Sequence, residues 1–155
     1  MPVIAERDRE ILLQRFEQSL ERDVTIKFFG ESHARSVLTI PGLPTNPMAQ
    51  IAGDLARELA DLSPKIKLEV YDFHGDGAEA ARELEITRVP AYVLGDDPEG
   101  RIRFYGTPVG NEFATMIETV EALSQDAPRL APTVVKMAQS LIQQPVQLQV
   151  FVTPT

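Results

Sequence analysis

The sequence contains no cysteine and no tryptophan among its 155 residues. Without a thiol, this chain can form no disulfide, bind no metal through thiolates and use no cysteine as a nucleophile. No apolar run approaches the roughly 20 residues that a membrane-spanning helix needs. The start of the chain, Met1 to Asp8, is charged almost at once and lacks the apolar core of a signal peptide. We therefore expect a cytoplasmic protein that does not enter a membrane.

Basic residues are also scarce. Fifteen Lys and Arg stand against 23 Asp and Glu, which gives a formal net charge of -8 and a pI of about 4.8. Nucleic-acid binders normally carry a basic stripe, and none is visible, so we expect no nucleic-acid partner. The chain is 43% hydrophobic, with charges of both signs interspersed, as is typical of a globular domain with one core.

Hydrophobic periodicity predicts an α/β chain in which helices and strands alternate. Helices are expected at 6–21, 46–62 and 78–85 and from Asn111, and strands at 24–29, 65–73, 91–94 and 101–105, with a long loop at 30–45. Strands separated by helices pair in parallel, and the last two form an antiparallel hairpin. We therefore expect a small mixed sheet with helices on both faces. Met48, Met116 and Met137 are expected at core positions, and Ile66, Leu68 and Val70 share one side of their strand. In the last predicted helix, Val134, Ala138, Leu141 and Ile142 are expected to point inward.

The end of the chain repeats its beginning. A helix is expected from about 132 to 143 and a strand at 146–152, and their sequence echoes the first helix and strand. Ser140-Leu141 matches Ser19-Leu20, and each pair precedes an alternating strand that begins with valine. A lone strand leaves its backbone groups without partners, so we expect residues 146–152 to pair with a second unit or with another subunit.

Three segments carry a family resemblance: 66–73, 88–91 with its Val-Pro pair, and 104–113 with the pattern Tyr-Gly-x-Pro-x-Gly-x-Glu-Phe. They resemble the N-terminal unit of the tandem-thioredoxin protein disulfide oxidoreductases, a glutaredoxin-like family of two fused units. The closing residues 150–155 resemble the segment that leads into the second Cys-Pro-x-Cys site of that family. The resemblance implies a thioredoxin-like fold, with one unit at 1–125 and a linker plus the start of a second unit at 126–155. For the complete family member it implies dithiol–disulfide exchange without a further cofactor.

The first Cys-x-x-Cys motif of that family is missing from this chain. Its place falls on Asn46, Pro47, Met48 and Ala49, at the start of the second predicted helix. There the reactive thiolate would be stabilised by the helix dipole and free N–H groups, whereas Asn46 can only cap the helix. A similar arrangement occurs in the N-terminal region of the flavoprotein component of alkyl hydroperoxide reductase, where two thioredoxin units are fused and the second alone keeps its cysteines.

Pro90 is the second site feature that the resemblance implies. The matching proline in thioredoxin-like folds is usually cis, and it exposes the backbone of the preceding residue, here Val89, to an extended peptide. The competing interpretation is that Pro90 merely begins a strand, where a missing N–H donor costs little.

Other chemistry finds little support in the sequence. His33, and His74 between Asp72 and Asp76, could suggest a metal site, but solvated turns look the same and no helix-spaced ligand pair is present. The chain has neither a Gly-x-Ser-x-Gly elbow nor a phosphate-binding glycine motif. We therefore predict no catalytic residue, metal or cofactor in this chain.

Three hypotheses follow. In the first, the chain is the redox-inactive N-terminal structural unit of a tandem protein disulfide oxidoreductase. In the second, it is a stand-alone module that binds extended peptide near Asn46 and Pro90 or assembles through residues 146–152. In the third, it is an enzyme that uses non-thiol chemistry in the same cleft.

Overall fold

The computed structural model describes residues 2–31, 47–125 and 130–152. Most of the predicted loop at 30–45 lies outside these residues. Along the chain run α1 (Glu6–Ser19), β1 (Val24–Gly30), α2 (Pro47–Ala60), β2 (Ile66–Asp72), α3 (Ala78–Glu83), β3 (Ala91–Leu94), β4 (Ile102–Tyr105), α4 (Asn111–Gln125) and α5 (Pro132–Leu141).

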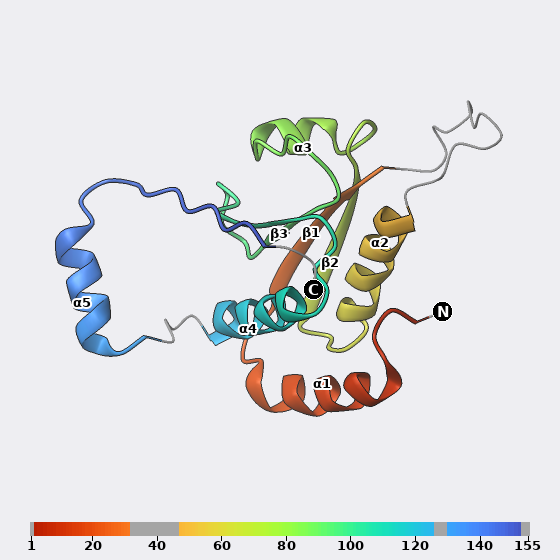
Figure 1. Ribbon diagram of the computed structural model, residues 1–155, viewed down its shortest axis with the longest axis horizontal. Coiled ribbons are helices and arrows are strands. Elements are labelled where there is room, and N and C mark those ends of the chain that lie inside the picture. Colours follow the sequence, from red (N-terminus) through yellow and green to blue (C-terminus); the bar gives the residue numbers. More distant parts are fainter. Residues whose placement is uncertain (1, 32–46, 126–129, 153–155) are drawn as a thin grey trace.

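The four strands form one mixed sheet in the order β2-β1-β3-β4. β1 pairs in parallel with β2 from Val24 opposite Ile66 to Gly30 opposite Asp72. β3 runs antiparallel to both of its neighbours, and Ala91 lies opposite Phe29 on one side and Tyr105 on the other. The prediction of a small mixed sheet with helices on both faces is therefore confirmed (Figure 1).

Each face of the sheet has its own core. Val24, Ile26 and Phe28 of β1 point to the face covered by α1, α2 and α4. Phe29, which follows Phe28 directly, is fully buried on the opposite face, where α3 packs. Successive side chains of a strand alternate between faces, so β1 supplies both cores. In Figure 1, α3 lies on the other side of the strands from α1 and α4.

A buried carboxylate joins the first helix to the last helix of this unit. The side chain of Glu121 on α4 is 2% exposed and accepts hydrogen bonds from Arg15 Nε at 2.6 Å, Arg15 Nη2 at 2.7 Å and Ser19 Oγ at 2.9 Å. A buried charge is costly unless it is paired and hydrogen-bonded, and here a bidentate guanidinium and a hydroxyl meet both needs. We call these three side chains the α1–α4 clasp.

Tyr92 anchors α2 to the middle of the sheet. It is fully buried on β3, and its hydroxyl donates a 2.7 Å hydrogen bond to the carbonyl of Ala52 on α2. Burial raises the pKa of the Tyr92 phenol, because the charged form would lose its hydration. This bond fixes the position of α2 on the sheet, and with it the position of the start of α2.

Several apolar side chains are exposed, and they include Met48 and Met137, which were predicted at core positions. Met48 is 43% exposed because it lies in the first turn of α2, and Val70 is 50% exposed because β2 is an edge strand. Met137 is 60% exposed because it lies on α5, which has no buried residue. Met116, in contrast, is fully buried as predicted.

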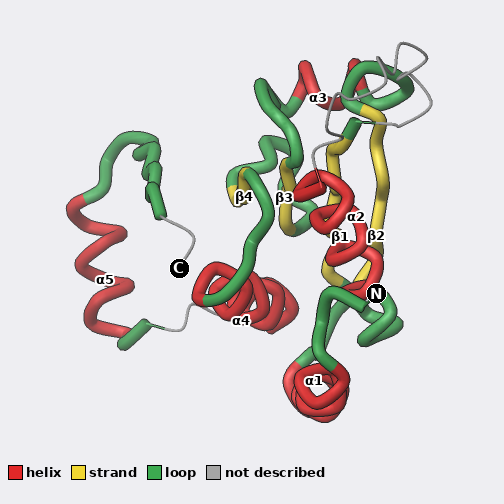
Figure 2. Tube along the Cα trace, turned by 45° about the vertical axis from the view of Figure 1, so that its right-hand side comes forward, coloured by secondary structure: helices red, strands yellow, loops and turns green. Residues whose placement is uncertain are grey.

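The end of the chain stands apart from the sheet, as the turned view of Figure 2 shows. α5 ends at Leu141, earlier than predicted, and has no buried residue, although Val134, Ala138 and Leu141 were expected to point inward. Residues 146–152 are not a strand in this structure, because no neighbouring strand offers them a ladder of hydrogen bonds. Their apolar side chains are 52–85% exposed. Nowhere in the described ranges is a helix both long and apolar enough to cross a bilayer.

The clasp gives a first testable prediction. We expect Arg15→Met to lower the free energy of unfolding by about 2 kcal/mol, because it removes the bidentate guanidinium from the buried Glu121 carboxylate. This is below the roughly 3–5 kcal/mol of a fully buried pair, since water reaches the 43%-exposed Arg15 side chain. Urea unfolding would measure it, with Arg7→Met on the exposed side of α1 as the control. Equal small losses in both variants would contradict a role for the clasp in stability.

Candidate functional site

One end of the sheet gathers the residues to which the sequence pointed. Because β1 and β2 are parallel and β3 is antiparallel to β1, their register places Gly30, Asp72 and Ala91 at the same end. The β3–β4 pairing brings Tyr105, the last residue of β4, to this end as well. The candidate site lies here.

The positions at which the resemblance places the Cys-x-x-Cys motif lie at the start of α2, at this end of the sheet. Asn46 lies outside the described residues, and α2 begins at Pro47. Met48 is exposed and Ala49 is half-buried. The first turn of α2 contains no acidic side chain. Such a first turn favours an anion or a thiolate, because the helix dipole places partial positive charge there. The side chains of Met48 and Ala49, however, offer no reactive group.

The Val89–Pro90 peptide bond is cis, in agreement with what the resemblance implied. Val89 is half-buried and packs against the core on the α3 face. The carbonyl of Pro90 accepts a 2.8 Å hydrogen bond from the N–H of Gly106. Within the part of the chain that the structure describes, no hydrogen bond uses the backbone N–H or C=O of Val89. The peptide-binding role of Val89 and Pro90 stays a prediction.

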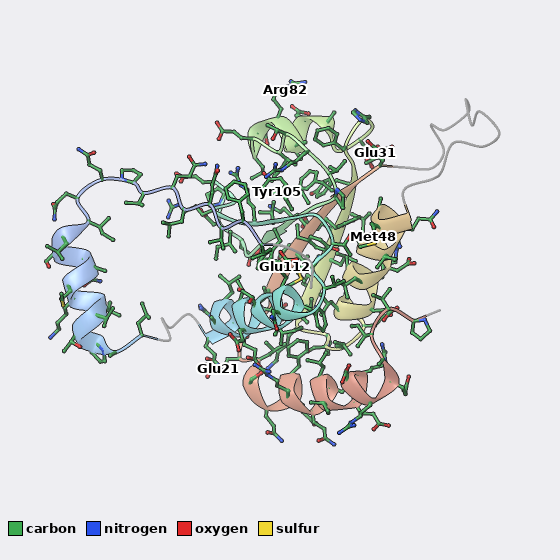
Figure 3. The ribbon with its side chains drawn as sticks, viewed as in Figure 1. Glu21, Glu31, Met48, Arg82, Tyr105 and Glu112 are labelled. Carbon is green, nitrogen blue, oxygen red and sulfur yellow. The ribbon has the colours of Figure 1, made fainter. Side chains whose placement is uncertain are left out.

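A short loop after β4 holds these two parts together. Gly106 donates to Pro90, and the hydroxyl of Thr107 donates a 2.9 Å hydrogen bond to the carbonyl of Met48 on α2. Gly106 has a φ of 92°, which a residue with a side chain rarely adopts. Figure 3 labels Met48 and Glu112, which mark the starts of α2 and α4 on either side of this loop. Sequence reasoning used Gly106 only as part of a family pattern and did not predict the contact between Thr107 and Met48.

An arginine and an aromatic ring support the loop from the α3 face. The guanidinium of Arg88 lies 4.7 Å from the centre of the Tyr105 ring, in cation–π geometry. Arg88 directly precedes Val89, and Tyr105 directly precedes Gly106. The contact between Arg88 and Tyr105 therefore lies next to the hydrogen bond between Gly106 and Pro90.

The structure describes one of the two histidines. His33 lies outside the described residues, and His74 Nε2 lies 3.6 Å from Glu31 Oε1 in an exposed pair. Asp72 and Asp76 bind backbone N–H groups of their own turn. Nearby on β2, the hydrogen bond that the Tyr71 hydroxyl donates to Glu69 raises the pKa of Tyr71. Among the described residues, no three His, Asp or Glu side chains are grouped so that they could hold a metal ion.

The chemistry open to this arrangement is limited. The Thr107 hydroxyl contacts the start of α2, and it donates to a carbonyl rather than to a base that could activate it. The backbone of Val89, in contrast, can pair with an extended chain through hydrogen bonds, as a sheet edge does. These described residues offer backbone hydrogen-bonding groups rather than a reactive side chain, and the binding of extended peptide stays a prediction.

Solved structures share this fold. A protein disulfide oxidoreductase from Aeropyrum pernix K1 matches 88% of this chain with a TM-score of 0.69 and 22% identity, and 55% of its own chain is covered. The NTD_N/C domain of alkylhydroperoxide reductase AhpF from Enterococcus faecalis matches 90%, with a TM-score of 0.69, 22% identity and 61% coverage. The AhpF subunit of the same organism, as a C503A mutant, matches 86%, with a TM-score of 0.66, 22% identity and 58% coverage.

No protein-family model and no curated protein sequence matches the chain. The chain spans between 55% and 61% of the length of the three structures named above. At 22% identity these matches establish the fold and nothing finer. The chain has a thioredoxin-like fold, as the resemblance of segments 66–73, 88–91 and 104–113 implied.

The loop after β4 gives a second testable prediction. A Cβ at Gly106 would meet nothing within 4 Å, so Gly106→Ala isolates the effect of its positive φ. We expect this variant to lose about 1–2 kcal/mol of unfolding free energy. Gly53→Ala in the middle of α2 is the matched control, since its Cβ would make ordinary contacts and should stabilise the helix by about 1 kcal/mol. Opposite signs in denaturant unfolding are the expected result, and a neutral Gly106→Ala would mean that the loop tolerates another conformation.

Proposed function

We propose that this chain is a redox-inactive thioredoxin-like unit that supports a second such unit, in the arrangement of a tandem protein disulfide oxidoreductase. Thiol–disulfide exchange then belongs to the complete protein and not to residues 1–155, which contain no cysteine. The structural neighbours share the fold of this unit, which makes the proposal reasonable without deciding it.

A residue-by-residue match between β1 and the tail carries the proposal. When Val146 is aligned with Val24, residues 146–152 read Val-Gln-Leu-Gln-Val-Phe-Val against Val-Thr-Ile-Lys-Phe-Phe-Gly. Every buried position of β1, namely Val24, Ile26, Phe28 and Phe29, is apolar in the tail. The half-exposed Thr25 and Lys27 are replaced by glutamines. The tail therefore has the side-chain pattern of a central strand whose two faces are both covered.

The apolar side chains of residues 146–152 are exposed to solvent. Leu148 and Val150 are each 85% exposed, and Phe151 is 81% exposed. Apolar surface of this kind is usually covered by a partner. We propose that residues 146–152 become the first strand of a second thioredoxin-like unit, or, failing that, pair with another subunit.

A stand-alone peptide-binding module is the second candidate. The observation that favours it is the Val89 backbone, which precedes the ladder of β3 and makes no hydrogen bond to any described residue. The two candidates are separated by the coding sequence after the codon for Thr155. A Cys-Pro-x-Cys motif and a second unit there support the tandem protein, whereas a stop codon excludes it and favours the module. For both candidates, the cytoplasmic location stays a prediction.

Installing the missing dithiol tests whether the start of α2 is a degenerate redox site. We expect Asn46→Cys combined with Ala49→Cys to reduce insulin disulfides with dithiothreitol as the electron source. The thiol at the helix start should have a pKa below the usual value of about 8.5, because free N–H groups and the helix dipole stabilise its anion. Asn46→Ser with Ala49→Ser is the control. A double variant with an ordinary thiol pKa and no activity would contradict the assignment of this site.

Removing the tail tests whether it belongs to this unit. Since α5 has no buried residue, we expect a chain that stops at residue 129 to unfold within about 2 °C of the complete chain in a thermal melt. It should also self-associate less in sedimentation velocity, because it lacks the exposed apolar side chains of 134–152. A much lower melting temperature would show that the tail stabilises the first unit instead.

A further inference from the structure

The α1–α4 clasp has a counterpart in the tail. When Ser140-Leu141 is aligned with Ser19-Leu20, Lys136 falls on Arg15. The same alignment places Met137 on Phe16, which is 1% exposed in the core of the first unit. The two side chains that hold Glu121, a cation and a hydroxyl four residues further on, are thus both repeated in α5.

Lys136 is distinctive within the tail. It is the one charged residue between Leu130 and Thr155 in the sequence. It lies on a helix whose neighbouring apolar side chains are open to solvent, with Val134 at 47%, Met137 at 60% and Leu141 at 72% exposure. Once a partner covers those side chains, the Lys136 ammonium beside them loses part of its hydration and needs an acceptor.

Within the described part of the chain, no hydrogen bond or ion pair ties the Ser140 hydroxyl or the Lys136 ammonium to a second element. Ser140 donates to the carbonyl of Met137 within its own helix at 2.9 Å, whereas Ser19 donates to the carboxylate of Glu121. Lys136 makes no ion pair with any residue that the structure describes. Residues four apart lie on the same face of a helix, so Lys136 and Ser140 can reach one group together.

We propose that Lys136 and Ser140 of α5 together bind one carboxylate that is buried within the apolar stripe of a partner helix, in the way that Arg15 and Ser19 hold Glu121. The inference rests on the proposed function, and the partner is the counterpart of α4 in the second unit. The α4 helix of another copy does not fit, because its Glu121 is already held by Arg15 and Ser19. Lysine offers a single point charge where arginine offers a bidentate fork, so the second clasp makes fewer bonds than the first.

The experiment uses the protein expressed with the coding sequence that follows Thr155. The second unit is expected to end in an amphipathic helix with Asp or Glu between apolar residues, as Glu121 follows Val120 in α4. We expect Lys136→Met to lower the melting temperature by roughly 4 °C, while Lys136→Arg retains it. Gln139→Met, at an exposed position of the same helix, is the matched control and should change little.

A double-mutant cycle decides the pairing. In the Lys136→Met background, replacing the partner carboxylate by its amide should lower the melting temperature little further. Arg15→Met combined with Glu121→Gln gives the reference cycle within the first unit. If the losses in melting temperature are additive, or if the last helix of the second unit has no carboxylate in its apolar stripe, this inference is overturned. The proposed function is still upheld in that case by a second unit that carries its dithiol. A coding sequence that stops at Thr155 would overturn both.

Discussion

The hydrogen-bonded ladders on both sides of β1 are the constraint on which the rest of the structure depends. β1 pairs with β2 along its whole length and with β3 from Ile26 to Phe29. Since both of its edges are occupied, its side chains must alternate between two covered faces, and Phe28 and Phe29 consequently enter different cores. α2 is then placed by the fully buried Tyr92 on β3, so the start of α2 inherits its position from the sheet.

The elements were predictable where one local pattern decided them. The alternation of Val24 to Phe29 located β1, and the short apolar run that follows Pro90 located β3. Both strands formed at or near the expected residues. Exposure was less predictable, because it depends on the neighbours of an element. Val70 alternates correctly but lies on an edge strand, and the apolar side chains of α5 have no partner. The strand predicted at 146–152 did not form for the same reason, since a strand needs a ladder and not only a pattern.

The candidate site was predictable in its covalent features and less so in its contacts. Pro90 could be identified because a proline after valine at the start of a strand resembles a known family feature, and its peptide bond is cis. The hydrogen bond from Thr107 to Met48 joins residues far apart in the sequence, and no local pattern announces it. Glu121 carried a signal that sequence reasoning did not use. A carboxylate within an apolar stripe predicts a buried charge, although its partner Arg15 emerges only from the packing of α1 on α4.

A thioredoxin-like unit does not need its thiols to hold the site region in shape. The two hydrogen bonds that position the loop after β4 both end on backbone carbonyls. The N–H of Gly106 donates to Pro90, and the hydroxyl of Thr107 donates to Met48. Met48 and Ala49, which occupy two of the missing motif positions, are not among the buried residues of either core. Substitutions at these two positions therefore leave both cores intact. The fold persists in a chain without cysteine because the positions at which the resemblance places the motif and the residues that form the two cores are separate sets.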